Sequence, residues 1–401
     1  MRILYTHSGN LRAPKANLVH VARMSQAFAK IPTIVNLYYP RYILGNTLAQ
    51  EDVRSFYSLA DNVRIRPLIT FLIPWFDGTW LVPISKTIGY VFELPRLFVR
   101  DRVRSNDLVF ATCFLASAFF SVIRRLLPRS LRPILLFEAH DPPRGIRARV
   151  LKEADGIVAI TEALKQILVS DLRIEDDKIL VASNGVPEAW TQNLINKRDA
   201  RIKLGLDAEL PYVMYTGNLN RDVYADTLEL LIEIARALEG EAQLIQIGNP
   251  PPANNRSNEL PHNLQFLGLQ PLEAVRVFQA AADVLLIPYS SRLRTVKFMS
   301  PVKLLEYMAA GRPIVAFDHS VLREVLTDRE NAVLIQPDDS FAMAEGIRSV
   351  LADSELSDWI SNNAQQQAKA HTWEQRARAI VKFAIERQIA ARSNPSVELG
   401  Q

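Results

Sequence analysis

A lysine and a glutamate three residues apart, in a segment with helix signals at both ends, are the residues with the clearest chemical potential. The segment reads SPVKLLEYMAAGRP over residues 300–313. Ser300 is a favoured N-cap and Pro301 suits the first helical position. Gly311 followed by Pro313 is typical of a helix end. The spacing therefore predicts one short helix that begins and ends within this segment.

The amino end of that helix is expected to bind an anion. Backbone N–H groups in a first helical turn lack partners within the helix, and the helix dipole adds positive potential there. Ser300, Pro301 and Val302 form this end, and Lys303 adds a full charge. Glu306 lies one turn further on the same face, so one element would hold a phosphate and a neighbouring sugar hydroxyl. The alternative is a solvated Lys/Glu pair on an ordinary amphipathic helix.

The whole segment resembles the donor-site signature of the group 1 (family 4) glycosyltransferases of GT-B architecture, in the subgroup that reads S-P-x-K-x-x-E-Y-M-A-x-G-[KR]-P. The resemblance implies that Lys303 contacts the diphosphate of a nucleotide-sugar and that Glu306 holds the ribose hydroxyls. Many relatives carry a second glutamate eight positions before Glu306, where this chain has Phe298. Recognition of the transferred sugar therefore does not carry over from those relatives.

Further donor-binding candidates lie where predicted strands end. They are Gly9, Gly217, Asn218, Gly248 and Phe266. A glycine at such a position lets the backbone approach a ligand closely. The family commonly has an arginine near position 218 and a Lys-Gly pair near positions 223 and 224, which this chain lacks. We expect Arg221, or one of Arg292, Arg294 and Lys297, to reach the diphosphate instead.

The segment FEAHD at residues 137–141 ends another predicted strand and resembles the family's E-x-H-D segment. The resemblance implies that His140 faces the donor sugar, while Glu138 braces the loop. The alternative is a structural histidine at a strand end. The proposed catalytic residues are therefore His140, Lys303 and Arg221.

Glycosyl transfer passes through a cationic sugar while negative charge builds on the departing diphosphate. Lys303, the helix N–H groups and Arg221 are placed to stabilise that charge. The sequence contains no Asp-x-Asp triplet, so we expect a reaction without a metal site and without a cofactor beyond the nucleotide-sugar co-substrate. Retention of anomeric configuration is implied by the resemblance only.

Apolar runs alternate with helical patterns twice along the chain, which predicts an α/β fold with two facing Rossmann-like, doubly wound domains. Predicted strands lie at residues 3–6, 34–38, 108–111, 134–138, 156–160 and 179–182, and again at 212–216, 243–247, 264–267, 284–287, 314–317 and 332–335. Residues 1–185 form the expected acceptor-binding domain, residues 186–370 the nucleotide-sugar domain, and residues 371–390 a helix that crosses back. A polar connection is expected up to about residue 210. Parallel sheets bind ligands beyond the carboxyl ends of their strands, which predicts a shared interdomain cleft.

The amino-acid composition limits the classes to which this protein can belong. The chain has 401 residues, 48% of them hydrophobic, and one cysteine, Cys113, which excludes an internal disulfide and a cysteine-rich metal site. We find no signal peptide and no segment long enough to span a bilayer, so a cytoplasmic location is expected.

Basic residues gather in the first half, near an aromatic and apolar stretch that contains Trp75 and Trp80. This pattern favours peripheral contact with the inner face of a membrane and a lipid-linked or polysaccharide acceptor. Core packing is the other explanation of the aromatic stretch. Nucleic acid is not an expected partner, because no recognisable reading motif is present.

The sequence predicts a glycosyltransferase. A non-catalytic nucleotide-sugar-binding or partner subunit on the same fold is the alternative, because Phe298 and Asn218 depart from the family pattern. An epimerase or a phosphorylase is disfavoured, because neither class shows the signature of residues 300–313.

Overall fold

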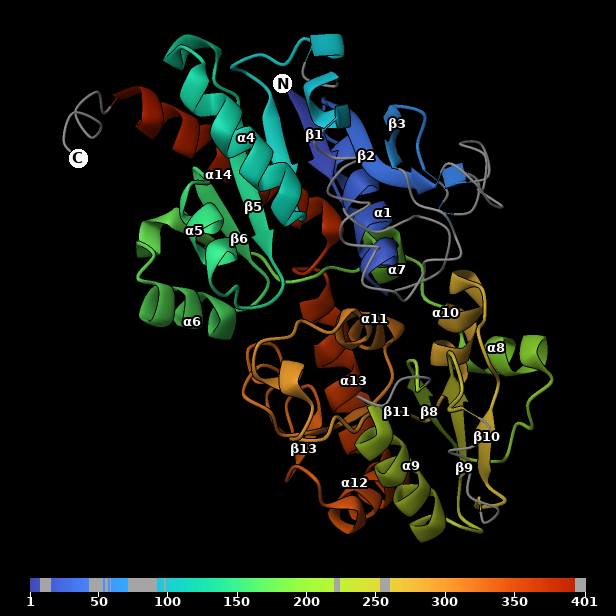
Figure 1. Ribbon diagram of the computed structural model, residues 1–401. Helices are drawn as coiled ribbons and strands as arrows, with labels where there is room; N and C mark the ends of the chain where they lie inside the picture. The colour runs from blue at the N-terminus through green and yellow to red at the C-terminus, as the bar shows by residue number, and fades with distance from the viewer. Residues whose placement is uncertain are drawn as a thin grey trace. The chain divides into compact units, whose positions relative to one another are not determined.

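The computed structural model describes residues 1–7, 16–42, 53–54, 57, 59–70, 92–96, 99–219, 224–252 and 260–393 of the chain. These residues form two units (Figure 1), which are described separately. Unit 1 comprises Met1–Ser183 together with Trp373–Gln401, and unit 2 comprises Asn184–Thr372. Each unit is built on a parallel sheet.

Unit 1 contains a parallel sheet with the strand order β3-β2-β1-β4-β5-β6-β7. Its strands are β1 (Arg2–Thr6), β2 (Ile34–Tyr42), β3 (Val63–Thr70), β4 (Leu108–Ala111), β5 (Ile134–Ala139), β6 (Gly156–Ala159) and β7 (Ile179–Val181). Its helices include α1 (Ala16–Ala29), α4 (Phe114–Leu126), α5 (Ile146–Lys152), α6 (Glu162–Leu172) and α14 (Trp373–Ser393). The strand order changes direction between β1 and β4, so this is the switch point of the sheet.

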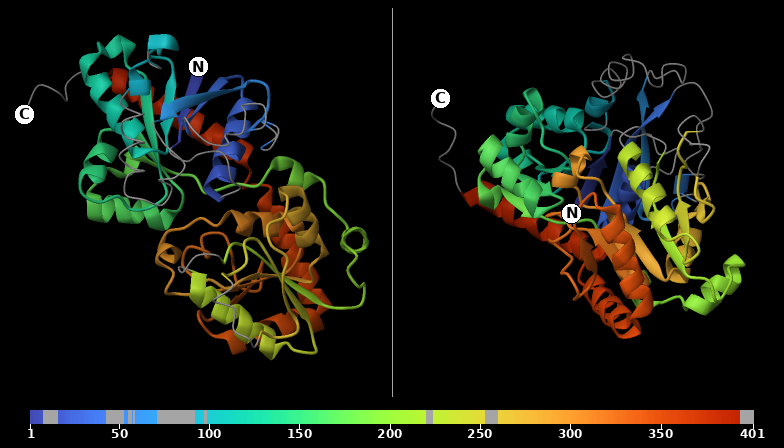
Figure 2. Two further views of the ribbon diagram at one scale, coloured as in Figure 1. Left: turned by 45° about the vertical axis from the view of Figure 1, so that its right-hand side comes forward. Right: turned by 90° about the horizontal axis from the view of Figure 1, so that it is seen from below.

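Helices cover both faces of this sheet. Right-handed crossovers that run in opposite directions from a switch point place their helices on opposite faces. Accordingly, α4 packs with α5 on one face, while α1 packs with α14 on the other. Figure 2 shows from two further directions that α14, in red, lies against the sheet of unit 1. A Cβ atom at Gly156 would lie 2.6 Å from the Phe383 ring, so the absent side chain lets α14 approach β6.

Unit 2 contains a second parallel sheet, with the order β10-β9-β8-β11-β12-β13. Its strands are β8 (Tyr212–Thr216), β9 (Gln243–Ile247), β10 (Leu264–Phe266), β11 (Val284–Ile287), β12 (Ile314–Phe317) and β13 (Val333–Ile335). Its helices include α7 (Glu188–Gln192), α8 (Lys197–Leu204), α9 (Ala225–Ala237), α10 (Leu272–Ala281), α11 (Val302–Ala310), α12 (Ser340–Ala352) and α13 (Ser354–Ala368). The switch point lies between β8 and β11.

Two elements differ from the sequence-based expectation. Strand β3 is not among the predicted strands, because arginines alternate with its apolar residues and Pro67 interrupts them. It is an edge strand, where a proline without an N–H is tolerated. The predicted polar connection contains α7 and α8; α8 is capped by Asn196 and ends at Gly205 in the left-handed conformation. Its short, charged sequence gives little apolar periodicity.

Among the described residues, no helix is both long and apolar enough to cross a bilayer. Trp75 and Trp80, on which the expected membrane contact depends, lie outside the described residues, as do Gly9 and Arg221.

Candidate functional site

Helix α11 carries the signature lysine and begins one residue later than expected. Pro301 occupies the N-cap position, with φ −70° and ψ 120°, so the prediction that Ser300 caps the helix is wrong. The Ser300 hydroxyl instead accepts a hydrogen bond from the backbone N–H of Asn184 at 3.1 Å. The Asn184 amide also donates to the Ser300 carbonyl. The helix ends as predicted, at Gly311 in the left-handed conformation with φ 62°.

The Lys303 ammonium lies at the switch point of the second sheet. Its Nζ atom is 3.9 Å from the centre of the Tyr215 ring, at the end of β8, and 5.1 Å from that of Tyr289, just after β11. A Cβ atom at Gly217 would be 2.4 Å from Nζ. The structure therefore brings Gly217 and Lys303 together, as a binding site at the strand ends requires.

The environment of Lys303 changes its acidity. Burial lowers the pKa of Lys303 from its ordinary value to about 7, and the nearby Glu306 carboxylate opposes this effect only in part. The two tyrosine rings favour the charged form through their negative faces but provide no anion. An ammonium group in this position gains most from a ligand that brings negative charge.

Tyr307 fixes the helix to β8, the strand that immediately precedes Gly217. Its hydroxyl accepts hydrogen bonds from the Thr216 backbone N–H at 2.7 Å and from the Thr216 hydroxyl at 3.0 Å. The Tyr307 side chain is fully buried. Sequence reasoning gave no role to Tyr215, Tyr289 or Tyr307. Tyr307 lies within the signature, but the meeting of all three depends on how α11 packs on the sheet.

Three glycines form a continuous edge beyond β8, β9 and β10. The Gly217 N–H donates to the Ile247 carbonyl at 2.8 Å, and the Gly248 N–H donates to the Gly268 carbonyl at 2.9 Å. Gly248 has a φ of 136°, and a Cβ atom there would lie 2.4 Å from the Gly217 carbonyl oxygen. The backbone is therefore closely packed at the place where a ligand would approach.

Asn218 and Phe266, two more predicted donor-binding residues, contact the protein itself. The Asn218 side-chain oxygen accepts hydrogen bonds from the backbone N–H of Asn249 at 2.9 Å and from its amide at 3.1 Å. It thereby joins the loops after β8 and β9. The Phe266 side chain packs against the hydrophobic core of unit 2.

Glu306 and Phe298 lie close in sequence to Lys303 but differ in what they offer a ligand. The Glu306 carboxylate is partly buried and accepts a hydrogen bond from the Gln279 amide at 3.3 Å. Phe298 is 6% exposed and belongs to the core. The position that is a glutamate in many relatives is therefore filled by a buried apolar ring.

The remaining candidate cations in the part of the chain that the structure describes are exposed. The Arg292 side chain is 81% exposed and lies 3.5 Å from the Asp226 carboxylate. Arg294 and Lys297 are also exposed, on the short 3₁₀ turn before α11.

In unit 1, the sequence-predicted His140 belongs to a buried ionic cluster. The Glu138 side chain is fully buried, and its Oε2 atom lies 3.1 Å from His20 Nε2 and 3.3 Å from His140 Nε2. Its Oε1 atom accepts a hydrogen bond from Arg376 of α14. The Arg376 guanidinium also donates to the carbonyl of Ser183 at 2.9 Å. The cluster thus joins α1, β5 and α14.

Charge in this cluster is compensated internally. Burial by itself would raise the pKa of the Glu138 carboxyl, but His20, Arg376 and His140 outweigh that effect and hold the pKa well below its usual range. The His140 side chain is 41% exposed, so it is accessible to a ligand. By distance alone, His20, Glu138 and His140 could hold a metal ion. The Arg376 guanidinium already neutralises their carboxylate and disfavours a second cation.

We predict that Arg376→Ala lowers the free energy of unfolding by about 3–5 kcal/mol, because it leaves the Glu138 charge buried without its guanidinium partner. Urea denaturation measures the change. Arg378→Ala, an exposed substitution on the same helix, is the control and should change the value by less than about 0.5 kcal/mol. Equal effects of the two substitutions would contradict a structural role for the cluster.

Comparisons with known proteins found similarity to glycosyltransferases. Residues 210–353 match the family model for glycosyl transferases group 1. An uncharacterized glycosyltransferase of Methanocaldococcus jannaschii is 25% identical over 248 residues, which cover 58% of this chain and 61% of that protein. A D-inositol 3-phosphate glycosyltransferase of Xylanimonas cellulosilytica is 25% identical over 247 residues, 58% of this chain and 57% of that protein. The matches thus span about three fifths of these relatives.

Two solved structures share the fold along nearly the whole chain. Sucrose-phosphate synthase from Thermosynechococcus elongatus has a TM-score of 0.75 at 17% identity, and the match covers 98% of this chain and 99% of that one. Anabaena HepE in complex with UDP has a TM-score of 0.68 at 16% identity, with 96% and 100% covered. The predicted pair of Rossmann-like domains is confirmed: the fold is that of GT-B glycosyltransferase structures, and unit 2 carries the match to the group 1 family.

Proposed function

We propose that this protein is a glycosyltransferase that moves a sugar from a nucleotide-sugar to a glycan or lipid-linked acceptor. The observation that carries the proposal is the Lys303 ammonium, held against the Gly217 backbone at the carboxyl end of β8. The group 1 family match over residues 210–353 and the UDP complex of the fold neighbour HepE support the same conclusion.

The diphosphate is assigned to the amino end of α11. Lys303 belongs to the first turn of this helix, whose backbone N–H groups favour an anion, and a bound anion would favour the charged form of the lysine that burial disfavours. Because Gly217 has no side chain, the Lys303 Nζ atom can lie beside the strand end. Glu306, one turn along the helix, is assigned to the ribose hydroxyls of the donor.

Lys303 acts chiefly on the leaving group. As the glycosidic bond breaks, negative charge accumulates on the diphosphate, and a fixed ammonium in a partly dry site stabilises it with little reorganisation. We propose that the reaction retains anomeric configuration and uses no metal ion. His140 is the candidate in unit 1 for contact with the reacting sugar, and Glu138 fixes the orientation of its ring.

A non-catalytic binding subunit is the second candidate function. The buried Phe298 favours it, because this residue replaces a glutamate that contacts the transferred sugar in many relatives of the family resembled.

Under either function, we propose a cytoplasmic protein. Peripheral contact with a membrane through the N-terminal domain stays a prediction.

The decisive experiment is donor turnover by the parent protein and by Lys303→Ala, with UDP-, GDP-, ADP- and CMP-sugars as donors. Loss of the ammonium should lower turnover by about a hundredfold to a thousandfold. Lys203→Ala, which removes an exposed lysine on α8, is the matched control and should leave turnover unchanged. Nucleotide binding by the parent without turnover on any donor would favour the binding subunit.

Donor binding should also depend on pH. Lys303 has a pKa of about 7 in the free protein, and the bound diphosphate favours the ammonium form and so raises that value. Affinity should therefore be nearly constant below pH 7 and fall by up to about tenfold per pH unit above it.

Calorimetry in buffers with different ionisation enthalpies measures the proton uptake that this mechanism requires. Uptake on binding a nucleotide-sugar should be small at pH 6 and approach one proton at pH 8.5. It should vanish in Lys303→Gln. Uptake that persists in that variant would show that another group is titrating.

Two glycine substitutions test the edge beyond β8 and β9. Gly217→Ala brings a methyl group to 2.4 Å from the Lys303 Nζ atom and 2.7 Å from the buried Tyr215 hydroxyl, so it should weaken donor binding by about tenfold or more and should also lower the free energy of unfolding. Gly248→Ala places its methyl group against backbone at a strained φ, and should lower the free energy of unfolding by about 2–4 kcal/mol. Titration calorimetry and thermal unfolding distinguish these outcomes. The assignment of the diphosphate to this edge fails if Gly217→Ala binds the donor as the parent does.

A further inference from the structure

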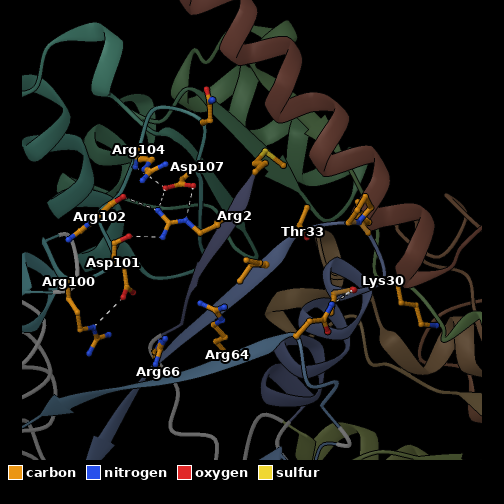
Figure 3. A pocket seen from close by; sticks show the side chains of 17 residues that line it. Arg2, Lys30, Thr33, Arg64, Arg66, Arg100, Asp101, Arg102, Arg104 and Asp107 are labelled. Atoms are coloured by element: carbon orange, nitrogen blue, oxygen red, sulfur yellow. Dashed lines mark hydrogen bonds and ion pairs between the residues drawn. The ribbon is translucent and has the colours of Figure 1, made fainter.

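A basic hollow of about 1250 Å³ opens at the amino edge of the sheet of unit 1 (Figure 3). Its lining includes the start of β1, the residue before β4 and the first half of β3. The basic residues that line it are Arg2, Lys30, Arg64, Arg66, Arg100, Arg102 and Arg104, and the acidic ones are Asp101 and Asp107. Positive charge is therefore in large excess.

Arg2 stabilises one wall of this hollow through hydrogen bonds from its guanidinium to other residues of the protein. Its guanidinium donates to Asp107 Oδ1 at 3.1 Å and Oδ2 at 2.5 Å, and to the carbonyls of Asp101 at 2.6 Å and Arg102 at 3.0 Å. The backbone N–H of Arg104 also donates to Asp107 at 2.8 Å. These bonds hold residues 101–107 in place, so that the arginines of this loop are presented from a fixed backbone.

The carboxylates of both acidic residues already accept hydrogen bonds from other residues of the protein. Asp107 serves Arg2, and Asp101 accepts hydrogen bonds from the Tyr38 hydroxyl and, at 3.3 Å, from Arg100. Arg64 and Arg66 are two residues apart on β3, so their side chains leave the strand on the same face. Figure 3 shows both directed toward the hollow, across from Arg100.

Two observations indicate that the hollow is built for a ligand. The Nε atom of Arg66 is buried and has no hydrogen-bond partner among the described residues, and a buried unpaired donor costs about 1–3 kcal/mol. The lining also carries seven basic side chains against two acidic ones. The repulsion between these like charges and the unpaired guanidinium nitrogen are both relieved by an oxyanion, which accepts bidentate hydrogen bonds from arginine.

The hollow is separate from the proposed reaction site. In unit 1 it lies at the amino ends of the strands, whereas His140 follows the carboxyl end of β5. Strand β1, five residues long, runs from Arg2 at the hollow to Thr6 at the opposite edge, a distance of about 13–17 Å. A ligand held by Arg64 and Arg66 would therefore take no part in bond breaking.

We propose that this hollow binds a phosphate group, and that Arg64 and Arg66 are its principal ligands. The phosphate belongs either to a phospholipid headgroup at a membrane surface or to a free phosphorylated solute. In both cases it anchors or regulates unit 1 at a place distinct from the donor site at Lys303. This proposal does not depend on the reaction that the protein catalyses.

Binding of two probes to the full-length protein tests the proposal. Inorganic pyrophosphate is measured by calorimetry in a Lys303→Ala background, which silences the proposed donor site. Vesicles of phosphatidylcholine with one quarter phosphatidylglycerol are measured by co-sedimentation. Replacing both arginines, Arg64→Gln with Arg66→Gln, should weaken binding of at least one probe by tenfold or more. Loss for pyrophosphate identifies a solute site, and loss for the vesicles alone identifies a headgroup site.

The matched control replaces two exposed basic residues of α14, Arg378→Gln with Lys382→Gln, and removes the same charge from the same unit. It should retain binding of both probes. If the β3 variant does not fold, as judged by circular dichroism, Arg104→Gln is used, because only its backbone takes part in the bonds to Asp107. The proposal is overturned if the parent binds neither probe, if the hollow variants bind as the parent does, or if the control loses as much as they do.

Discussion

The partial burial of one ammonium group is the constraint that organises the candidate site of unit 2. Lys303 is partly buried between the rings of Tyr215 and Tyr289, where desolvation lowers its pKa to about 7. The group is held there because Tyr307 fixes α11 to the end of β8 and because Gly217 has no side chain. The site is thus organised for a charge that the protein itself does not supply.

Unit 1 handles a buried charge in the opposite way. Glu138 is as deeply buried as any residue of the core, yet Arg376, His20 and His140 surround it and its pKa stays low. This arrangement leaves little demand for an external ion and instead joins the C-terminal helix to the sheet. His140 is the member of the cluster that stays substantially exposed, which makes it the member suited to contact a ligand.

Sequence patterns predicted most of the strands, because buried parallel strands are short apolar runs between helical patterns. Strand β3 was missed since an edge strand tolerates Pro67 and its alternating arginines. Helix α8 was missed since a short surface helix has almost no apolar face. The N-cap of α11 was misplaced by one residue, because the Ser300 hydroxyl bonds to Asn184, 116 positions earlier in the chain.

The sequence by itself determined the α/β class, the helix that carries Lys303 and Glu306, and the glycines at the strand ends, because these depend on local spacing and backbone freedom. Only the tertiary structure decided that Lys303 lies beside Gly217 and the rings of Tyr215 and Tyr289, that Arg376 neutralises Glu138, and that a basic hollow forms beside β3. These features join residues tens to hundreds of positions apart. Their electrostatic consequences depend on burial, which follows from packing rather than from order along the chain.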